Sequence, residues 1–384
     1  MKHKKIAAAV ATAGLAVGSA GLALPAGAET GGSPNAFYEV TVTVTNLAPE
    51  GGTFQTPVWV GVHGGTFDLY DRGEPVTAGL EMLAEDGGTG GVTAEFDANG
   101  DGQDATLFGP DGPIAPGQQA TRTFLVQPRE GEAGYLSYAS MVIPSNDAFI
   151  ANGDPLAHPL FDDAGNFIGE DFVVTGAQVL DAGTEVNDEL PANTAFFGQQ
   201  TPNTGVDQGE GVELHPGFNP VGSGGILDSA MFAGADFTAE GYELLGVEVS
   251  AEQVDFRESS RLRGSNEVPR VDTRATGNVV LRPNAEGGID YSIRAVRIDD
   301  VVAAHLHVGV RGENGPIVAN LLTEPAGDGF RLRLSGTVTE DDLVGPFEGM
   351  STADLWRAID EGRIYVNIHT AEFPAGELRS NLGG

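Results

Sequence analysis

The stretch AAHLHVGVRGENGPIV, residues 303–318, places two of the chain's seven histidines two positions apart. Residues i and i+2 of a β-strand point to the same face, so His305 and His307 share one face of the strand that the surrounding apolar letters predict. The letters GENGP that follow are typical of a loop, and IVANLL, from residue 317, predicts the next strand. The stretch therefore predicts β-structure with a pair of histidines on one face.

More strand patterns lie on both sides of this stretch. They are GNVVLRP (277–283), IDYSIRAVRI (289–298), FRLRLSGTV (330–338) and IYVNIHT (364–370). One helix interrupts them: it begins at Ser351, has Asp354 three residues later in the pattern of a capping box, and ends at Gly362. The second half of the chain is thus predicted to be mostly antiparallel sheet.

The first half also has the pattern of short strands. FYEVTVTVTNL, residues 37–47, alternates apolar and polar letters with period two. Helical periodicity is convincing only in PVTAGLEMLAEDG, residues 75–87, and the acidic stretch from there to about residue 104 is expected to be turns. With 56 glycines and 22 prolines in 384 residues, we predict an all-β fold of two antiparallel β-sandwich domains in series, residues 29–250 and 251–384, with few short helices.

The first 28 residues have the composition of a secretory signal peptide. A basic tip, MKHKK, precedes an apolar stretch rich in Ala, Gly, Leu and Val, and the triplet Ala26-Gly27-Ala28 predicts cleavage before Glu29. No later stretch is long and apolar enough to cross a bilayer. The mature protein is therefore expected outside the cytoplasm, without insertion into a membrane.

The chain contains 55 acidic residues, 20 basic residues and no cysteine, and its formal net charge is −35. Disulfide bonds and thiol chemistry are thereby excluded. Nucleic acid and anionic membrane surfaces are poor partners for such a charge. So many carboxylates fit either a salt-loving (halophilic) source or a calcium-rich extracellular setting, and the composition leaves both open.

Three blocks of the second half together resemble the CHRD domain. They are SNEVPRVDTRATGNVVL (265–281), AAHLHVGVRGENGPIVANL (303–321) and GRIYVNIHTAEFPAGELRSNL (362–382). The resemblance covers nearly all of residues 256–384. It implies a secreted β-sandwich-like module without a settled activity.

Two further residues extend the histidine pair: His369, in the other histidine-bearing strand, and Glu377, just after that strand. Three imidazoles and a carboxylate suit Zn²⁺ or Cu²⁺, so His305, His307, His369 and Glu377 are candidate ligands. The alternative is structural, with the histidines forming hydrogen bonds across two neighbouring strands and holding the GENGP loop in place. The residues alone leave both interpretations open.

Six blocks of the first half resemble the bacterial form of the spondin N-terminal domain: YEVTVTVTNLAP, PVWVGVHGG, GLEMLAEDG, SYASMVIPSNDAFIA, DAGTEVNDE and GVELHPGF, in this order within residues 37–218. The resemblance implies a C2-like β-sandwich with a Ca²⁺ site and a role in matrix attachment and cell adhesion. Carried over to this chain, the ligands are Asp147, Asp181 and Glu185. Glu185 stands where the animal pattern has Asp, and the animal disulfides are absent. The alternative for these acids is a solvated acidic surface.

The sequence contains no nucleophile motif and no phosphate-binding loop, so we expect no enzymatic activity. The leading hypothesis is a secreted adhesion or matrix-type binding protein with a Ca²⁺-stabilised spondin-like domain. Its expected partner is a protein or glycan of an extracellular surface or matrix. Two alternatives are a metalloprotein that binds Cu²⁺ or Zn²⁺ through the histidines of the second half, and a soluble modulator that sequesters a diffusible ligand.

Overall fold

The computed structural model describes residues 36–383, except 101, 129–132, 203, 255–256, 285, 323–325 and 327–329. In this part of the chain strands dominate and three α-helices interrupt them, which confirms the predicted all-β class. The predicted signal peptide, residues 1–28, lies outside the described residues. Short 3₁₀ helices occur at Gly176–Gln178, Ile226–Asp228, Gly264–Asn266, Glu340–Asp342 and Gly345–Phe347.

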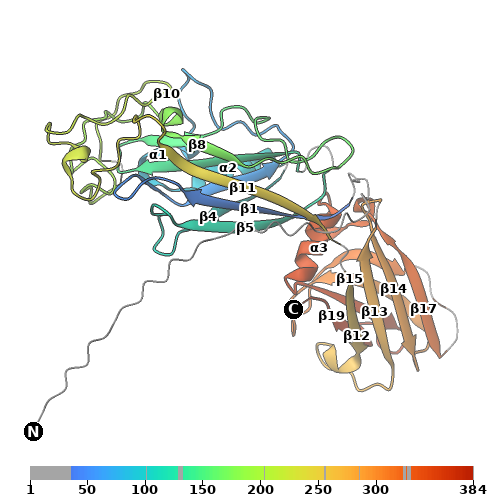
Figure 1. Cartoon of the computed structure of the whole chain (residues 1–384). Helices are drawn as coiled ribbons and strands as arrows, with labels where there is room; N and C mark the ends of the chain where they lie inside the picture. Colours follow the sequence, from blue (N-terminus) through green and yellow to red (C-terminus); the bar gives the residue numbers. More distant parts are fainter. Residues whose placement is uncertain are drawn as a thin grey trace, which may run out of the picture. The chain divides into compact units, whose positions relative to one another are not determined.

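The first region contains two antiparallel sheets around an apolar core (Figure 1). One sheet has the strand order β5-β1-β11-β8, and the other has the order β10-β9-β7-β6-β3-β4, with β2 beside β6. The alternating valines of β1, Val40, Val42 and Val44, are fully buried, as the period-two pattern predicts. The strands are β1 (Tyr38–Asn46), β2 (Phe54–Gln55), β3 (Val58–His63), β4 (Gly102–Leu107), β5 (Gln119–Val126), β6 (Tyr135–Ile143), β7 (Ala148–Ala151), β8 (Phe172–Thr175), β9 (Leu180–Asp181), β10 (Glu213–Leu214) and β11 (Glu243–Gln253).

Two helices, α1 (Ala78–Asp86) and α2 (Gly90–Asn99), pack with Trp59 of β3 into a second apolar core. The helix α1 was predicted, whereas α2 lies in the stretch that was expected to be turns. That expectation was wrong because α2 has almost no amphipathic pattern: its buried residues are only Val92 and Phe96. A helix held by two apolar contacts leaves little periodic signal in the sequence.

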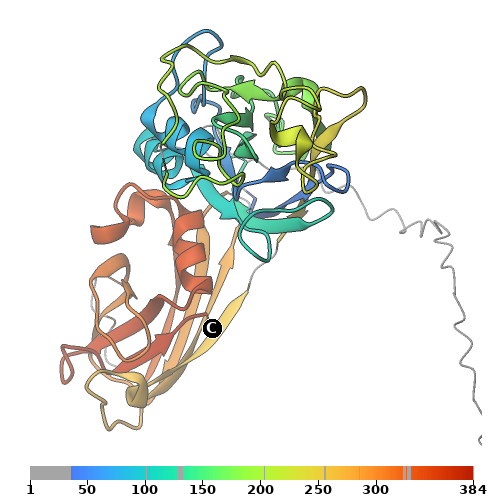
Figure 2. The ribbon, with the colours of Figure 1, turned by 90° about the vertical axis from the view of Figure 1, so that its left-hand side faces the viewer.

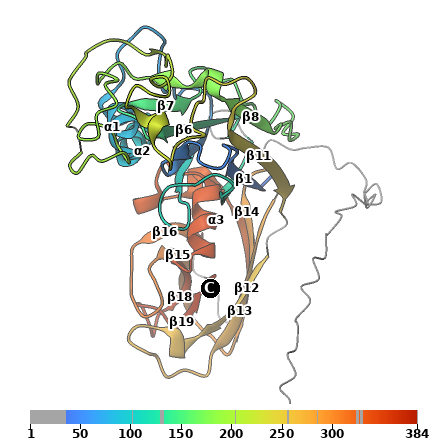
Figure 3. The same cartoon turned by 60° about the vertical axis from the view of Figure 1, so that its left-hand side comes forward.

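The second region is one eight-stranded antiparallel sheet with the order β16-β15-β18-β19-β12-β13-β14-β17. The sheet bends over its own core, and its edge strands β16 and β17 approach each other without pairing among the described residues. Figure 3 shows the two resulting layers, with β15, β16, β18 and β19 facing β12, β13 and β14. The strands are β12 (Glu258–Arg263), β13 (Thr276–Pro283), β14 (Ile289–Val296), β15 (Val301–Val308), β16 (Ile317–Leu322), β17 (Arg331–Val338), β18 (Ile364–Thr370) and β19 (Leu378–Asn381).

The helix α3 (Thr352–Asp360) has the predicted capping box. Ser351 Oγ accepts a hydrogen bond from Asp354 N at 3.1 Å, and the Asp354 carboxylate accepts one from Ser351 N at 2.9 Å. The helix lies beside the sheet of the second region (Figure 2). Its Leu355 and Trp356 belong to the core of that sheet. The sequence therefore predicted the start of this helix and its cap.

Two strands of this sheet, β12 and β19, were not predicted. Leu262 is the one residue of β12 that is buried, and β19 has only four residues, so neither shows a clear alternation. The predicted domain boundary, between residues 250 and 251, lies inside β11, which pairs with β1 as far as Gln253. The division into two domains stays a prediction.

Candidate functional site

Strand alternation turns the three histidines of the second region away from the core. On β15, Ala304 and Leu306 lie in the core, so His305 and His307 point to the opposite face. The antiparallel register of β15 and β18 places His369 on that same outer face, one row from His305. The predicted shared face of His305 and His307 is therefore confirmed, and His369 lies on the same face of the sheet.

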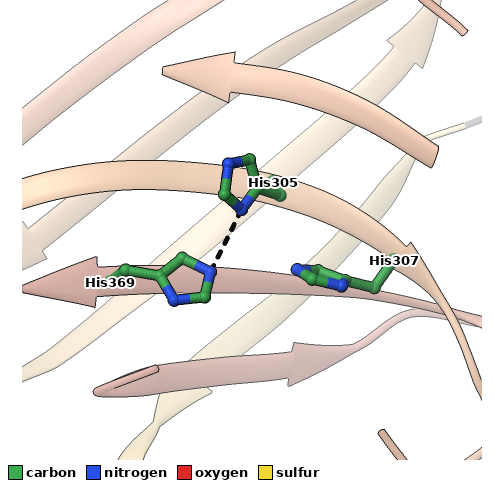
Figure 4. Close-up of side chains that lie close together, drawn as sticks. All are labelled: His305, His307 and His369. Carbon is green, nitrogen blue, oxygen red and sulfur yellow. Dashed lines mark hydrogen bonds between the residues drawn. The ribbon is translucent and has the colours of Figure 1, made fainter. Parts of the chain in front are cut away.

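The ring nitrogens of these histidines converge (Figure 4). One nitrogen from each ring lies within 4.8 Å of the other two, and His305 Nδ1 lies 3.1 Å from His369 Nε2. Within the described residues this is the one cluster of three or more His, Asp or Glu side chains with such spacing. We call His305, His307 and His369 the histidine cluster.

Backbone carbonyl groups orient two of the rings. His307 Nδ1 lies 3.0 Å from the Gly315 carbonyl oxygen, and His369 Nδ1 lies 3.0 Å from the Pro374 carbonyl oxygen. Because a carbonyl oxygen only accepts, each Nδ1 carries the hydrogen and each Nε2 keeps a lone pair. His307 Nε2 is buried and has no hydrogen-bond partner among the described residues. One ring nitrogen on a carbonyl and the other one free is the usual arrangement of a metal-binding histidine.

A tyrosine and an arginine hold His307 from the side. The Tyr365 ring stacks on the His307 ring with 4.8 Å between centroids, and the Arg379 guanidinium carbon lies 3.5 Å from the Tyr365 centroid. Because β18 lies between β15 and β19, Tyr365 lies between the other two side chains. Arg379 is fully buried and donates hydrogen bonds to Asn314 Oδ1 and the Val310 carbonyl oxygen. It thereby ties the loop after β15 to the histidine cluster.

Burial lowers the pKa of all three imidazoles. The pKa of His305 falls to about 4, first because burial disfavours the charged ring and then because His369 and His307 would repel its charge. Burial is also the main cause of the lowered pKa of His307 and His369. At neutral pH the rings are therefore uncharged, which is the form that binds a metal ion.

Glu377, the fourth predicted ligand, does not belong to the histidine cluster. Its carboxylate accepts hydrogen bonds from Thr273 Oγ1 at 2.6 Å and from Thr370 Oγ1 at 2.9 Å. The structure thus places Glu377 in a hydrogen-bond network that links β18 to the loop before β13.

The histidine cluster fits a transition metal ion. Two nitrogen ligands about 2.0–2.1 Å from one tetrahedral ion lie roughly 3.3 Å apart, close to the 3.1 Å between the His305 and His369 nitrogens. The His307 ring is farther from both, by centroid, but its nitrogen still lies within 4.8 Å of theirs. Imidazole nitrogen suits copper or zinc, and three ligands leave a fourth position open.

The three predicted calcium ligands also gather in one place. Asp147 directly precedes β7, Asp181 ends the neighbouring strand β9, and Glu185 follows in the next turn. Asp147 Oδ2 accepts hydrogen bonds from the backbone nitrogens of Thr184 and Glu185, at 2.9 and 3.0 Å. The Asp181 carboxylate already accepts hydrogen bonds from Gly183 N and from the side-chain amide of Asn187.

Two carboxylate oxygens of this group accept no hydrogen bond from any described residue: Asp147 Oδ1 and Glu185 Oε2. Both side chains are buried. Burial raises the pKa of each carboxyl to about 7, and the charge of Asp181 contributes to the shift of Asp147. A further buried carboxylate, Glu85 of α1, also raises the pKa of Glu185, and no local sequence signal indicated its presence here. Such oxygens need either a proton or a cation as a partner.

No helix in the described ranges is long and apolar enough to cross a membrane. The chain matches no curated protein. Residues 259–382 match the family model of the CHRD domain. The match does not reach residues 37–218, so the spondin-type resemblance of that region stays a prediction. The chain therefore contains a CHRD domain over residues 259–382.

Proposed function

We propose that this chain is a secreted, non-enzymatic binding protein whose CHRD domain holds a copper or zinc ion in the histidine cluster. The observation that carries the proposal is the convergence of three uncharged imidazoles on one strand face. An ion would take the place of the hydrogen between His305 and His369, and it would give His307 Nε2 the partner that it lacks.

The donor set favours Cu²⁺ over Zn²⁺, because affinity for nitrogen ligands rises to copper along the first-row series. All three ligands are side chains of paired strands, and the Arg379–Tyr365 stack fixes one of them. A three-histidine site leaves a coordination position for an outside donor. That position offers the domain a means of holding an extracellular ligand.

Isothermal titration calorimetry with Cu²⁺ and Zn²⁺ on untagged protein tests the site. We expect one ion per chain for the wild type and at least about 100-fold weaker binding for the double variant His305→Gln/His369→Gln. Substitution of the groups that merely hold the ligands already weakens metal affinity 10–100-fold. The control His158→Gln removes a histidine of the first region that stacks on Phe172, and it should bind like the wild type. Equal affinity of the double variant and the wild type would overturn the proposal.

Calcium binding in the first region is the second candidate, favoured by the buried oxygens Asp147 Oδ1 and Glu185 Oε2. Carboxylate oxygens are the ligands that Ca²⁺ prefers, and the ion would supply the positive partner that neither oxygen has among the described residues. The spondin-type resemblance adds Asp181 to this set and implies adhesion to an extracellular surface or matrix. Asp181 would first have to exchange its present hydrogen bonds for the ion.

Thermal unfolding in excess Ca²⁺ and in excess chelator tests this second site. An ion at 100 times its dissociation constant stabilises the folded state by about 2.7 kcal/mol, so Ca²⁺ should raise the unfolding temperature of the wild type but not of Asp147→Asn. The exposed acid Asp163 provides the matched control Asp163→Asn. The same gain in all three proteins would show general charge screening and no specific site.

A further inference from the structure

Six arginines of the CHRD domain lie on the outer face of β12, β13, β14 and β17. These strands lie side by side (Figure 1), and Leu262, Val279 and Ile293 point from them into the core, so the alternate residues point outward. The strand register aligns the outward side chains in rows. One row contains Arg261, Asn278, Arg294 and Arg333; the next contains Arg263, Thr276, Val296 and Arg331; and Arg282 lies opposite Asp290 in a third. We call this surface the arginine face.

The arginine face is unfavourable for the sheet itself. Arg294 lies directly opposite Arg333, and like charges in such a position destabilise a strand pair. All six side chains are exposed, and none forms an ion pair with a carboxylate in the part of the chain that the structure describes. Because folding does not benefit from these charges, their gathering on one face points to a ligand.

Two adjoining hollows lie on the arginine face. The larger, of about 840 Å³, is lined by Arg261, Arg263 and Arg294. Arg270 and the carboxylate of Asp272, both in the loop between β12 and β13, also line it. The smaller, of about 420 Å³, is lined by Arg282 and shares Arg294 with the first. The shared side chain makes the two hollows neighbours along one surface, with room for an elongated ligand.

The chemistry of the face selects the class of ligand. Its side chains other than arginine are mainly small and polar, such as Ser259, Ser292 and Ser335, and its outward rows contain no aromatic ring. Stable protein interfaces rely on buried aromatic and apolar anchors, and this face offers few of them: Val280 and Val296 in its rows and Tyr291 at the smaller hollow. Guanidinium groups instead match carboxylate and sulfate groups with paired hydrogen bonds.

The spacing of the arginines fits a ligand with repeated charges. Neighbouring strands lie about 4.8 Å apart, so the Arg294 and Arg333 stems are separated by one strand spacing and the Arg261 and Arg294 stems by two. Salt screens charges that are more than about 8 Å apart, so acidic side chains elsewhere on the chain oppose an anion at this face only weakly. At contact distance the arginines dominate.

We propose that the arginine face binds an acidic polysaccharide. The inference rests on the extracellular binding role proposed above and names a ligand class for it. The arginine face is a different surface from the histidine cluster, so an experiment can refute either proposal and leave the other standing. The repeated carboxylate or sulfate groups of the polymer lie along the rows of guanidinium groups, and its hydroxyl groups meet the serine and threonine side chains between them.

Biolayer interferometry with immobilised heparin, polygalacturonate and neutral dextran tests the proposal on untagged protein, with and without chelator. The test variant is Arg261→Ser/Arg294→Ser. The matched control, Arg311→Ser/Arg363→Ser, removes two exposed arginines that lie outside these rows. We expect binding to at least one of the acidic polymers and none to dextran, with the dissociation constant about 10-fold higher for the test variant and unchanged for the control.

The two acidic polymers distinguish sulfate from carboxylate recognition. Binding should persist in chelator and in His305→Gln/His369→Gln, which separates this surface from the metal site. Failure to bind either acidic polymer, or equal weakening in the test and control variants, would overturn the proposal. Self-association that the test variant abolishes, without polysaccharide binding, would assign the arginine face to a second copy of the chain instead.

Discussion

His307 shows how one side chain serves both the strand and the proposed ion: Nδ1 binds the Gly315 carbonyl oxygen and Nε2 stays available. The sequence predicted that His305 and His307 share a face, because strand alternation is a local property. It did not predict the stack of Tyr365 and Arg379, because this contact depends on β18 lying between β15 and β19. Local patterns thus predicted the shared face of the histidine pair but not the groups that hold it.

Replacement of Arg379 should weaken both the fold and the metal site. Arg379→Ala removes the hydrogen bonds to Asn314 and Val310 and leaves a cavity under Tyr365, so we expect a loss of about 3 kcal/mol in the free energy of unfolding. Denaturant unfolding measures this loss, and metal titration should show weaker binding because His307 loses its support. The exposed Arg363 provides the control Arg363→Ala. Equal stability of the two variants would contradict the account.

Glu267 should make the CHRD domain less stable as the pH rises. Burial raises its pKa to about 7, and Arg379 and Asn367 offset only part of this shift. From pH 4.5 to 7 the folded chain keeps a proton that the unfolded chain releases, so the free energy of unfolding falls through this range. Glu267→Gln removes this loss, and its stability relative to the wild type should grow with pH in denaturant unfolding. The exposed control Glu286→Gln should show no such trend, and a pH-independent difference for Glu267→Gln would refute the assignment.

Among the elements, α3 and α2 show what local sequence can predict. The capping box at Ser351 and Asp354 and the glycine at position 362 gave a clear signal for α3. The helix α2 has two buried residues and no side-chain cap, and β12 has one buried residue, so their structure depends on distant partners. The helix with a clear local signal was predicted, and the elements that depend on distant partners were missed.

Loss of the α3 cap should destabilise the domain modestly. Ser351→Ala removes the acceptor for Asp354 N, and we expect a loss of about 1 kcal/mol in the free energy of unfolding. Ser335→Ala, on an exposed strand position, provides the control. A loss equal to that of the control would show that the cap adds nothing.

At the level of the strand pair β14–β17, function and stability should conflict. Arg333→Thr removes one of two like charges that face each other, so we expect a gain of about 0.5 kcal/mol in the free energy of unfolding. Binding to acidic polysaccharide should weaken at the same time. The loop variant Arg311→Thr should give neither effect. A loss of stability in Arg333→Thr would show that the arginine supports the fold.

In the whole molecule, composition and surface lead to different expectations about partners. The net charge of −35 predicted that nucleic acid and anionic membrane surfaces are poor partners. The charge is unevenly distributed, however, since 14 of the 20 basic residues lie beyond residue 255, and the strand register gathers six of them on one face. Composition reports only the sum of charges, so a basic face within an acidic chain becomes visible only in the folded sheet.

The most direct test of the central claim is the native metal content of the untagged mature protein. Mass spectrometry of protein purified without added metal should find about one copper or zinc ion per chain. The folded triple variant His305→Gln/His307→Gln/His369→Gln should contain neither. Wild-type protein that remains free of both metals, even after exposure to an excess of each, would contradict the proposed metal site.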